Sequence, residues 1–185
     1  IKSTSLMLGS AVHSTIEFIL KNKSLPPDVE IIEKIKFELE KEGILDEKEL
    51  RRNTKEAEKA VRNWIENHYE NLQKDYDSER SIQFRDPKYK DLLMYGKLDL
   101  SERDSSGNLT ITDFKTGKPK TKNEIEKLDD EGRLSSYMRQ LAMYSYLVFG
   151  AEKGREVSSS RLLFLEGDPK YKNSVYSTFI DQTKI

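Results

Sequence analysis

The sequences YGKLD (residues 95–99) and DFKTG (residues 113–117) decide the fold of this chain. The residue pattern predicts one β-strand over 94–100 and a second over 109–114, because both stretches suit a pleated, half-buried surface. Residues 105–108 read Ser-Ser-Gly-Asn between them, which is a strong turn signal. We therefore expect a β-hairpin that carries an acidic residue on each strand.

The second strand places a carboxylate and an ammonium on one face. Alternate residues of a strand point the same way, so Leu109 and Ile111 lead directly to Asp113 and Lys115. A carboxylate at the edge of an apolar layer is costly unless it is paired or binds a metal. Asp99 and Asp113 could together bind Mg²⁺, which can activate a water molecule as a nucleophile. Lys115 would then stabilise charge developing on a phosphate. The alternative is a surface Asp–Lys ion pair, worth about 0–1 kcal/mol.

Near the start of the chain, apolar residues recur at helical spacing over residues 6–20, and a residue within 3–5 can cap this helix. Gly9 lies inside the helix at a cost of about 1 kcal/mol relative to alanine, which indicates close approach of another backbone. His13 and Glu17 are four residues apart and therefore share a face. The alternative for His13 is a packed or solvated residue that binds nothing.

A third segment, residues 134–148, has an apolar stripe at helical spacing. Gln140 lies one turn before Tyr144, so the amide and the phenol could meet a phosphate or a flipped-out base. The alternative is a core helix whose tyrosine is half buried.

The order of these motifs resembles that of the PD-(D/E)XK nuclease superfamily. More narrowly, it resembles the cluster-free RecB-type nuclease domain found at the C-terminal end of helicase–nucleases. The resemblance covers roughly residues 6–149 and implies an α/β fold with a restriction-endonuclease-like core, in which helices flank a mixed central sheet. The matching residues are Gly9, His13, Gly96, Asp99, Asp113, Lys115, Gly117, Gln140 and Tyr144.

The resemblance also implies roles for these residues. His13, Asp99, Asp113 and the backbone carbonyl of Phe114 would bind Mg²⁺ or Mn²⁺. Lys115 would be the catalytic lysine, with Asp99 and Asp113 as its catalytic partners. The choice between the two metals stays open, since both suit carboxylates, one imidazole and waters.

Other residues are expected near the DNA. Gln140 and Tyr144 would help to position the strand. Glu17 and Glu79 are secondary candidates, Glu79 because the family usually carries an acid on the strand before the hairpin. The alternative for Glu79 is a solvent-facing acid on an edge strand.

A run of lysines follows the predicted site, and of these Lys118 and Lys120 are expected to contact the phosphate backbone. The alternative is a solvated loop, and the acidic residues 129–131 weaken any simple basic groove. The net charge of the whole chain is −1, whereas a freestanding DNA binder is often strongly basic. A near-neutral nuclease makes better sense where a motor delivers the DNA to it.

Composition limits the remaining possibilities. The 185 residues suit one domain, residues 1–185, with no stretch of 18 apolar residues for a membrane span. The absence of cysteine excludes an iron–sulfur cluster and is compatible with a cytoplasmic location. The chain begins with Ile1 and has no phosphate-binding loop of a motor, so we expect a fragment of a longer helicase–nuclease.

The remaining segments complete the predicted organisation. A helical insertion is expected over residues 26–76 and a catalytic core over 78–180. Their expected elements are helices at 28–41 and 46–74, the latter with a break near 53–54, strands at 78–84, 158–165 and 174–180, and a mobile flap at 118–132.

The leading hypothesis is a metal-dependent DNA nuclease domain, the exonuclease part of a helicase–nuclease in DNA repair and recombination. Its DNA substrate would be single strands or duplex ends. Two alternatives stay open. One is a catalytically silent DNA-binding or scaffold domain, and the other is a freestanding nuclease of CRISPR or phage type.

Overall fold

The computed structural model describes residues 3–89, 91–165, 168, 170 and 174–182. The chain divides into two compact units. We call them the helical unit (residues 1–71, 114–119 and 164–174) and the sheet unit (residues 72–113, 120–163 and 175–185).

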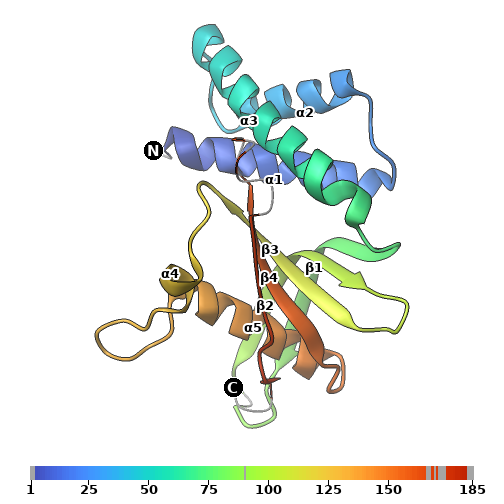
Figure 1. Cartoon of the computed structure of the whole chain (residues 1–185), viewed down its shortest axis with the longest axis vertical. Coiled ribbons are helices and arrows are strands. Elements are labelled where there is room, and N and C mark those ends of the chain that lie inside the picture. The colour runs from blue at the N-terminus through green and yellow to red at the C-terminus, as the bar shows by residue number, and fades with distance from the viewer. Residues whose placement is uncertain (1–2, 90, 166–167, 169, 171–173, 183–185) are drawn as a thin grey trace. The chain divides into compact units, whose positions relative to one another are not determined.

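The helical unit is built from α1 (Thr4–Asn22), α2 (Asp28–Lys41) and α3 (Glu47–His68), which pack on one another (Figure 1). The Ser3 side chain caps α1 by accepting a hydrogen bond from the Leu6 amide, which confirms the predicted start. The bounds predicted for α2 are confirmed as well. The apolar faces of the helices meet in a buried core that includes Ile16, Ile19, Ile35, Leu39 and Trp64.

The break predicted near residues 53–54 is wrong, because α3 runs through them without interruption. Asn53 and Thr54 donate side-chain hydrogen bonds to the carbonyls of Glu49 and Leu50, one turn earlier. Both polar side chains are thereby satisfied inside the helix and are buried. The helix ends at His68 and is followed by one 3₁₀ turn, so it stops before the predicted residue 74.

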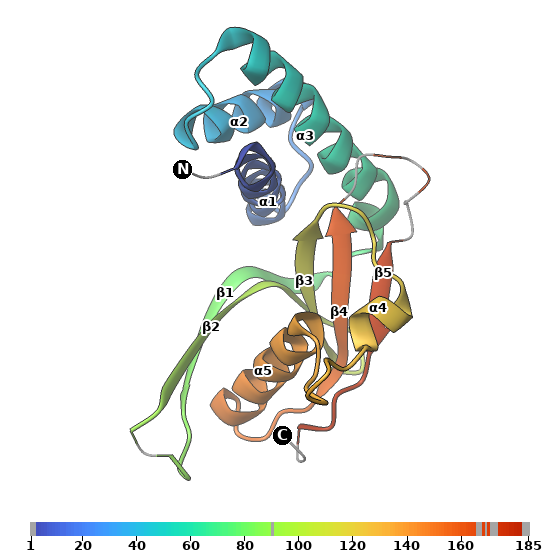
Figure 2. The ribbon, with the colours of Figure 1, turned by 90° about the vertical axis from the view of Figure 1, so that its left-hand side faces the viewer.

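The sheet unit contains five strands in the order β1-β2-β3-β4-β5. Neighbours β1–β2, β2–β3 and β4–β5 are antiparallel, whereas β3 and β4 run in the same direction (Figure 2). The mixed sheet confirms the predicted α/β class. The strands are β1 (Asp75–Arg85), β2 (Leu93–Arg103), β3 (Leu109–Thr116), β4 (Val157–Leu165) and β5 (Val175–Thr178).

The predicted hairpin is formed by β2 and β3. Asp104 closes its turn by accepting hydrogen bonds from the backbone amides of Ser106 and Asn108, and Gly107 has a φ of +81°. Hydrogen bonds from Asn108, followed by those of other turn amides, lower the pKa of Asp104. The turn therefore fixes which residues of β2 lie opposite those of β3.

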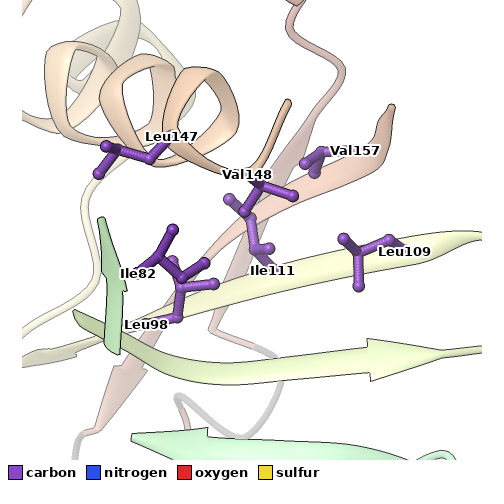
Figure 3. Close-up of a cluster of buried hydrophobic side chains, with 7 residues drawn as sticks. All are labelled: Ile82, Leu98, Leu109, Ile111, Leu147, Val148 and Val157. Carbon is purple, nitrogen blue, oxygen red and sulfur yellow. The ribbon is translucent and has the colours of Figure 1, made fainter. Parts of the chain in front are cut away.

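Helix α5 (Ser136–Ala151) covers one side of this sheet. Leu109 and Ile111 of β3 lie in a buried cluster with Leu147 and Val148 of α5 (Figure 3). This cluster continues directly into the segment of β3 that carries Asp113. The apolar face predicted to lead to the acidic residue is thus confirmed.

The polar segment 118–132 contains a short helix, α4 (Lys122–Glu126), that was not predicted. Thr121 and Glu124 form a capping box at its start, and this T-x-x-E pattern was the signal available in the sequence. Ile125 is fully buried, and its carbonyl accepts a hydrogen bond from Ser135. The segment is therefore anchored to the start of α5. None of the helices in the described ranges combines the length and hydrophobicity needed to cross a membrane.

Candidate active site

Three acidic residues lie at matching positions on neighbouring strands of the sheet unit. The β1–β2 pairs on both sides of Glu79 keep one register, which sets Glu79 opposite Asp99. On the other side of β2, Leu100 pairs with Thr112, and the same register continued by one residue sets Asp99 opposite Asp113. The hairpin therefore brings the two carboxylates predicted to bind metal to one level of the sheet.

Glu79 marks an irregularity in β1. Its φ is +53°, a value uncommon for any residue other than glycine, and such a conformation costs about 1–3 kcal/mol. Its side chain is only 12% exposed and forms an ion pair with Lys97 on β2. The secondary candidate Glu79 thus lies beside Asp99 in register, with its carboxylate bound to a lysine.

Asp113 is held by α5. The carboxylate is 6% exposed, and its Oδ1 accepts a hydrogen bond of 2.9 Å from Nε2 of Gln140. The second proton of the same amide is donated to Oη of Tyr144, at 3.1 Å. Gln140 therefore links the acidic residue to the tyrosine one turn further along the helix.

Gly96 allows α5 to lie this close to β2. A Cβ atom at residue 96 would lie 2.6 Å from Cδ1 of Leu147 and 3.3 Å from the Tyr144 ring. The first distance is too short for any real contact, so a larger residue would force the Leu147 side chain or the helix to shift. Close packing against α5 thus explains why a glycine stands in the YGKLD sequence, which the sequence alone did not reveal.

The Tyr144 hydroxyl is kept in its neutral form. Burial raises the pKa of Tyr144, the hydrogen bond from Gln140 opposes this change, and the nearby charges of Asp113 and Asp99 raise the pKa further. At neutral pH the phenol therefore retains its proton. It can donate one hydrogen bond while it accepts the bond from Gln140.

The helical unit contains the other predicted ligands. The imidazole of His13 packs edge-on against the Phe114 ring, with 6.0 Å between the ring centres. The Trp64 ring also lies steeply inclined to the Phe114 ring, with 6.4 Å between the ring centres. A Cβ atom on Gly9 would lie 2.7 Å from Oγ1 of Thr116, so α1 approaches the end of β3 closely. Gly9 thus packs closely against the Thr116 side chain, whereas the prediction from Gly9 was close approach of another backbone. His13 lies against the residue that separates Asp113 from Lys115.

The remaining charged candidates have varied surroundings. Lys115 is half-buried on β3, where strand alternation gives it the same face as Asp113. Glu17 forms an ion pair with Lys21. Lys118 is exposed. The Lys120 ammonium lies 3.5 Å from a carboxylate oxygen of Glu124, which weakens its attraction for an anionic ligand.

The donor set fits a magnesium-like ion. Among the residues that the structure describes, no three His, Asp, Glu or Cys side chains are grouped so that they could hold a metal together. Mg²⁺, however, is usually held by one or two carboxylates, with waters and substrate phosphates completing its octahedron. The Asp99 and Asp113 carboxylates carry hard oxygen donors of the kind that such an ion prefers.

The sequence pattern named these candidate residues but did not reveal how Gln140 and Asp113 are connected. It assigned Gln140 to the DNA, whereas the structure shows its amide bound to Asp113, 27 positions away in the chain. No local pattern could reveal this bond, because it depends on how α5 crosses the sheet.

Comparisons with known proteins match the chain to one family model. The family model described as "PD-(D/E)XK nuclease superfamily" matches residues 2–183. No curated protein matches the chain. A solved structure described as "Crystal structure of SSO0001" is similar at 10% sequence identity, with 100% of this chain and 73% of that chain covered and a TM-score of 0.34.

Proposed function

Because the chain belongs to the PD-(D/E)XK nuclease superfamily, we propose that it hydrolyses phosphodiester bonds of DNA with Mg²⁺ or Mn²⁺. The observation that carries this proposal is the buried Asp113 carboxylate, oriented by Gln140 on the strand that also bears Lys115. A buried carboxylate is expensive to maintain, and this one lies in register with a second carboxylate, Asp99. Such a pair suits a cation better than it suits a folded core.

We propose that Asp99, Asp113 and the Phe114 carbonyl hold the metal, with His13 as the ligand that the family resemblance adds. A bound ion of this kind makes its water more acidic and offsets negative charge on the phosphate.

The protein's own groups position the reaction. Gln140 holds the Asp113 carboxylate in one orientation, which reduces the reorganisation needed when substrate binds. Lys115, on the same face of β3, donates to a phosphate oxygen on which charge develops. The neutral Tyr144 hydroxyl offers a hydrogen bond next to both carboxylates, and Lys118 contacts the backbone of the DNA.

We further propose a RecB-type domain within a helicase–nuclease, as a single domain with a helical insertion. The motif order, the absence of cysteine and the net charge of −1 support this assignment. A silent scaffold domain is disfavoured because Asp99, Asp113 and Lys115 are all present, and a domain freed from catalysis need not keep them. The sequence of the whole gene would separate the helicase-fused form from a freestanding nuclease of CRISPR or phage type.

The test is metal binding by Asp113→Asn, measured by calorimetry with Mg²⁺ and Mn²⁺ on protein whose fold is verified by thermal melting. The matched control is Asp91→Asn, since Asp91 is an exposed acid on the same sheet unit. We expect Asp113→Asn to abolish binding and Asp91→Asn to leave it unchanged. Equal binding by Asp113→Asn and the wild type would refute the assigned site.

A further inference from the structure

The far half of the β1–β2 hairpin has a face that the proposed active site does not use. We call this part, residues 80–85 and 93–98, the ribbon. Figure 2 shows the paired strands β1 and β2 extending away from β3. Burial alternates strictly along the ribbon, so it has one covered face and one exposed face.

The covered face is fixed firmly to α5. Ile82 and Leu98 belong to the buried cluster with Leu147 (Figure 3). The ring of Phe84 occupies the space that a Cβ atom on Gly150 would need, only 2.5 Å away. An isolated two-stranded hairpin is at best marginally stable, and this backing therefore makes the ribbon a rigid surface.

The end of the ribbon is held in place as well. Asp86 is buried, and its carboxylate accepts hydrogen bonds from the Tyr146 hydroxyl of α5 and from the Lys88 amide. The Tyr146 ring also packs edge-on against Phe84, at 5.8 Å between centres. The exposed face is consequently presented in one orientation.

The exposed face is a ladder of aromatic, apolar and basic side chains. Its cross-strand pairs are Ser81 with Lys97, Gln83 with Tyr95 and Arg85 with Leu93. Tyr95 is 62% exposed and Leu93 is 52% exposed. Two further exposed apolar side chains, Tyr89 and Leu92, lie at the tip. Exposed apolar patches of this kind commonly mark binding surfaces.

Tyr95 is held as a platform. Its hydroxyl is hydrogen-bonded to Oγ of Ser81, at 3.0 Å, diagonally across the two strands. The bond fixes the tip of an exposed ring, so little conformational freedom is lost when a flat ligand stacks on it. An aromatic side chain fixed in this way suits a nucleobase, since every base has a stacking face.

The charge of the segment favours a nucleic acid. The segment from Glu79 to Lys97, both included, contains five basic and three acidic residues, in a chain whose net charge is −1. Arg85 and Lys88 are exposed, and the Lys88 ammonium lies 5.4 Å from the centre of the Tyr89 ring. A basic surface combined with exposed aromatic side chains is the pattern of proteins that bind single strands.

The ribbon is continuous with the proposed catalytic strand. Tyr95 and Asp99 are four residues apart on β2, which corresponds to at most about 14 Å of strand. A DNA strand bound at Asp99 can therefore reach Tyr95 within a few nucleotides.

We propose that the exposed face of the ribbon is a binding site for single-stranded DNA, in which Tyr95 stacks on an unpaired base and Arg85 and Lys88 contact the phosphates. Duplex DNA would gain less from this site, because its base faces are already stacked. The inference rests on the proposed function only for its biological context, since the ribbon residues are distinct from the residues that would hold metal.

The first experiment measures binding of a labelled thymidine oligonucleotide of about 16 nucleotides, the upper end of common single-strand site sizes. EDTA is present so that metal-dependent cleavage cannot occur. The variants are Tyr95→Ala, Tyr95→Phe and the matched control Phe179→Ala, because Phe179 is an aromatic residue of the same unit with 55% exposure. Because Tyr95 and Phe179 are exposed, their substitution should leave the fold unchanged, and thermal melting checks this.

We expect Tyr95→Ala to weaken binding by about fivefold to a hundredfold, the range for loss of one base–aromatic stack. Tyr95→Phe keeps the ring and should stay close to the wild type, as should Phe179→Ala. Duplex DNA of the same length should not distinguish Tyr95→Ala from the wild type. Equal weakening by Tyr95→Ala and Phe179→Ala, or no single-strand binding by the wild type, would overturn the inference. A face that binds another protein instead would give unchanged DNA affinity in Tyr95→Ala, which also overturns it.

A second readout separates this inference from the proposed function. With Mg²⁺, cleavage of a dinucleotide, which is too short to reach from Asp99 to Tyr95, should be equal in Tyr95→Ala and the wild type. Cleavage of the longer oligonucleotide should show a raised KM in Tyr95→Ala. Tyr95-dependent binding without any cleavage would support the single-strand site on the ribbon and contradict the proposed nuclease activity. Cleavage that does not depend on Tyr95 would support the nuclease activity and contradict the single-strand site.

Discussion

Replacing Gln140 with leucine should weaken metal binding at the proposed site without removing any of the proposed ligands. Leucine has a similar volume and a similarly good helix propensity, so α5 should keep its shape. The substitution removes the amide that donates to Oδ1 of Asp113 and to Oη of Tyr144. The Asp113 carboxylate then loses the donor that sets its orientation.

Two estimates give the size of the effect. A hydrogen bond to a charged group contributes about 1.5–3 kcal/mol. Loss of a residue that orients a metal ligand typically reduces metal affinity or activity by about 10–100-fold, or about 1.4–2.7 kcal/mol. Both estimates therefore predict a half-saturating Mg²⁺ concentration at least about tenfold higher in Gln140→Leu.

The assay determines this concentration in two ways, from the rate of DNA cleavage and from the rise in Tm as Mg²⁺ is added. Tyr144→Phe is the comparison variant, because it removes the other partner of the amide and leaves the Gln140–Asp113 bond in place. We expect a smaller change in Tyr144→Phe than in Gln140→Leu. The same half-saturating Mg²⁺ concentration in Gln140→Leu and the wild type would refute the positioning role of Gln140.

Three further predictions concern packing and pH. Gly96→Ala places a methyl group against Leu147. It should lower the free energy of unfolding by about 1–3 kcal/mol, which a thermal melt would show as a lower Tm. An unchanged Tm would contradict this close contact between β2 and α5. Gly9→Ala should destabilise the protein in the same way, and adding Thr116→Ala should lessen the loss, because it removes the atoms that the new methyl group meets. Chemical denaturation of the wild type, the two single variants and the double variant would measure this. Additive effects of the two substitutions would contradict the contact. Burial lowers the pKa of His68 below its usual value of 6.5. As the pH falls below 6.5, the unfolded chain therefore binds a proton at His68 before the folded chain does, and the free energy of unfolding decreases. Denaturation across this range should show a smaller decline in His68→Gln, and an equal decline would contradict the prediction.

Regular elements could be predicted well wherever a periodic pattern and a local stop signal coincide. The bounds of α2 follow from its apolar spacing and the glycine at residue 43, which has a φ of +107°. The β2–β3 hairpin follows from its turn residues. The error in α3 arose because Asn53 and Thr54 usually favour helix starts, whereas burial and bonds to the preceding turn keep them within the helix.

The sequence could suggest the candidate site only as a set of residue types. Strand alternation places Asp113 and Lys115 on one face, and the hairpin register brings Asp99 to Asp113. The bond from Gln140 to Asp113 and the left-handed backbone at Glu79 depend on contacts between distant segments. Such contacts leave no trace in local composition, so a sequence pattern alone cannot reveal them.

The central claim is that Asp99, Asp113 and Lys115 form a metal-dependent nuclease site. Its most direct test is degradation of end-labelled single-stranded and duplex DNA with Mg²⁺, Mn²⁺ or EDTA, by the wild type and by Lys115→Ala. We predict cleavage by the wild type that requires metal and is lost in Lys115→Ala, with the fold of the variant unchanged. Equal cleavage by both proteins, or no cleavage of either DNA by the wild type with either metal, would contradict this account.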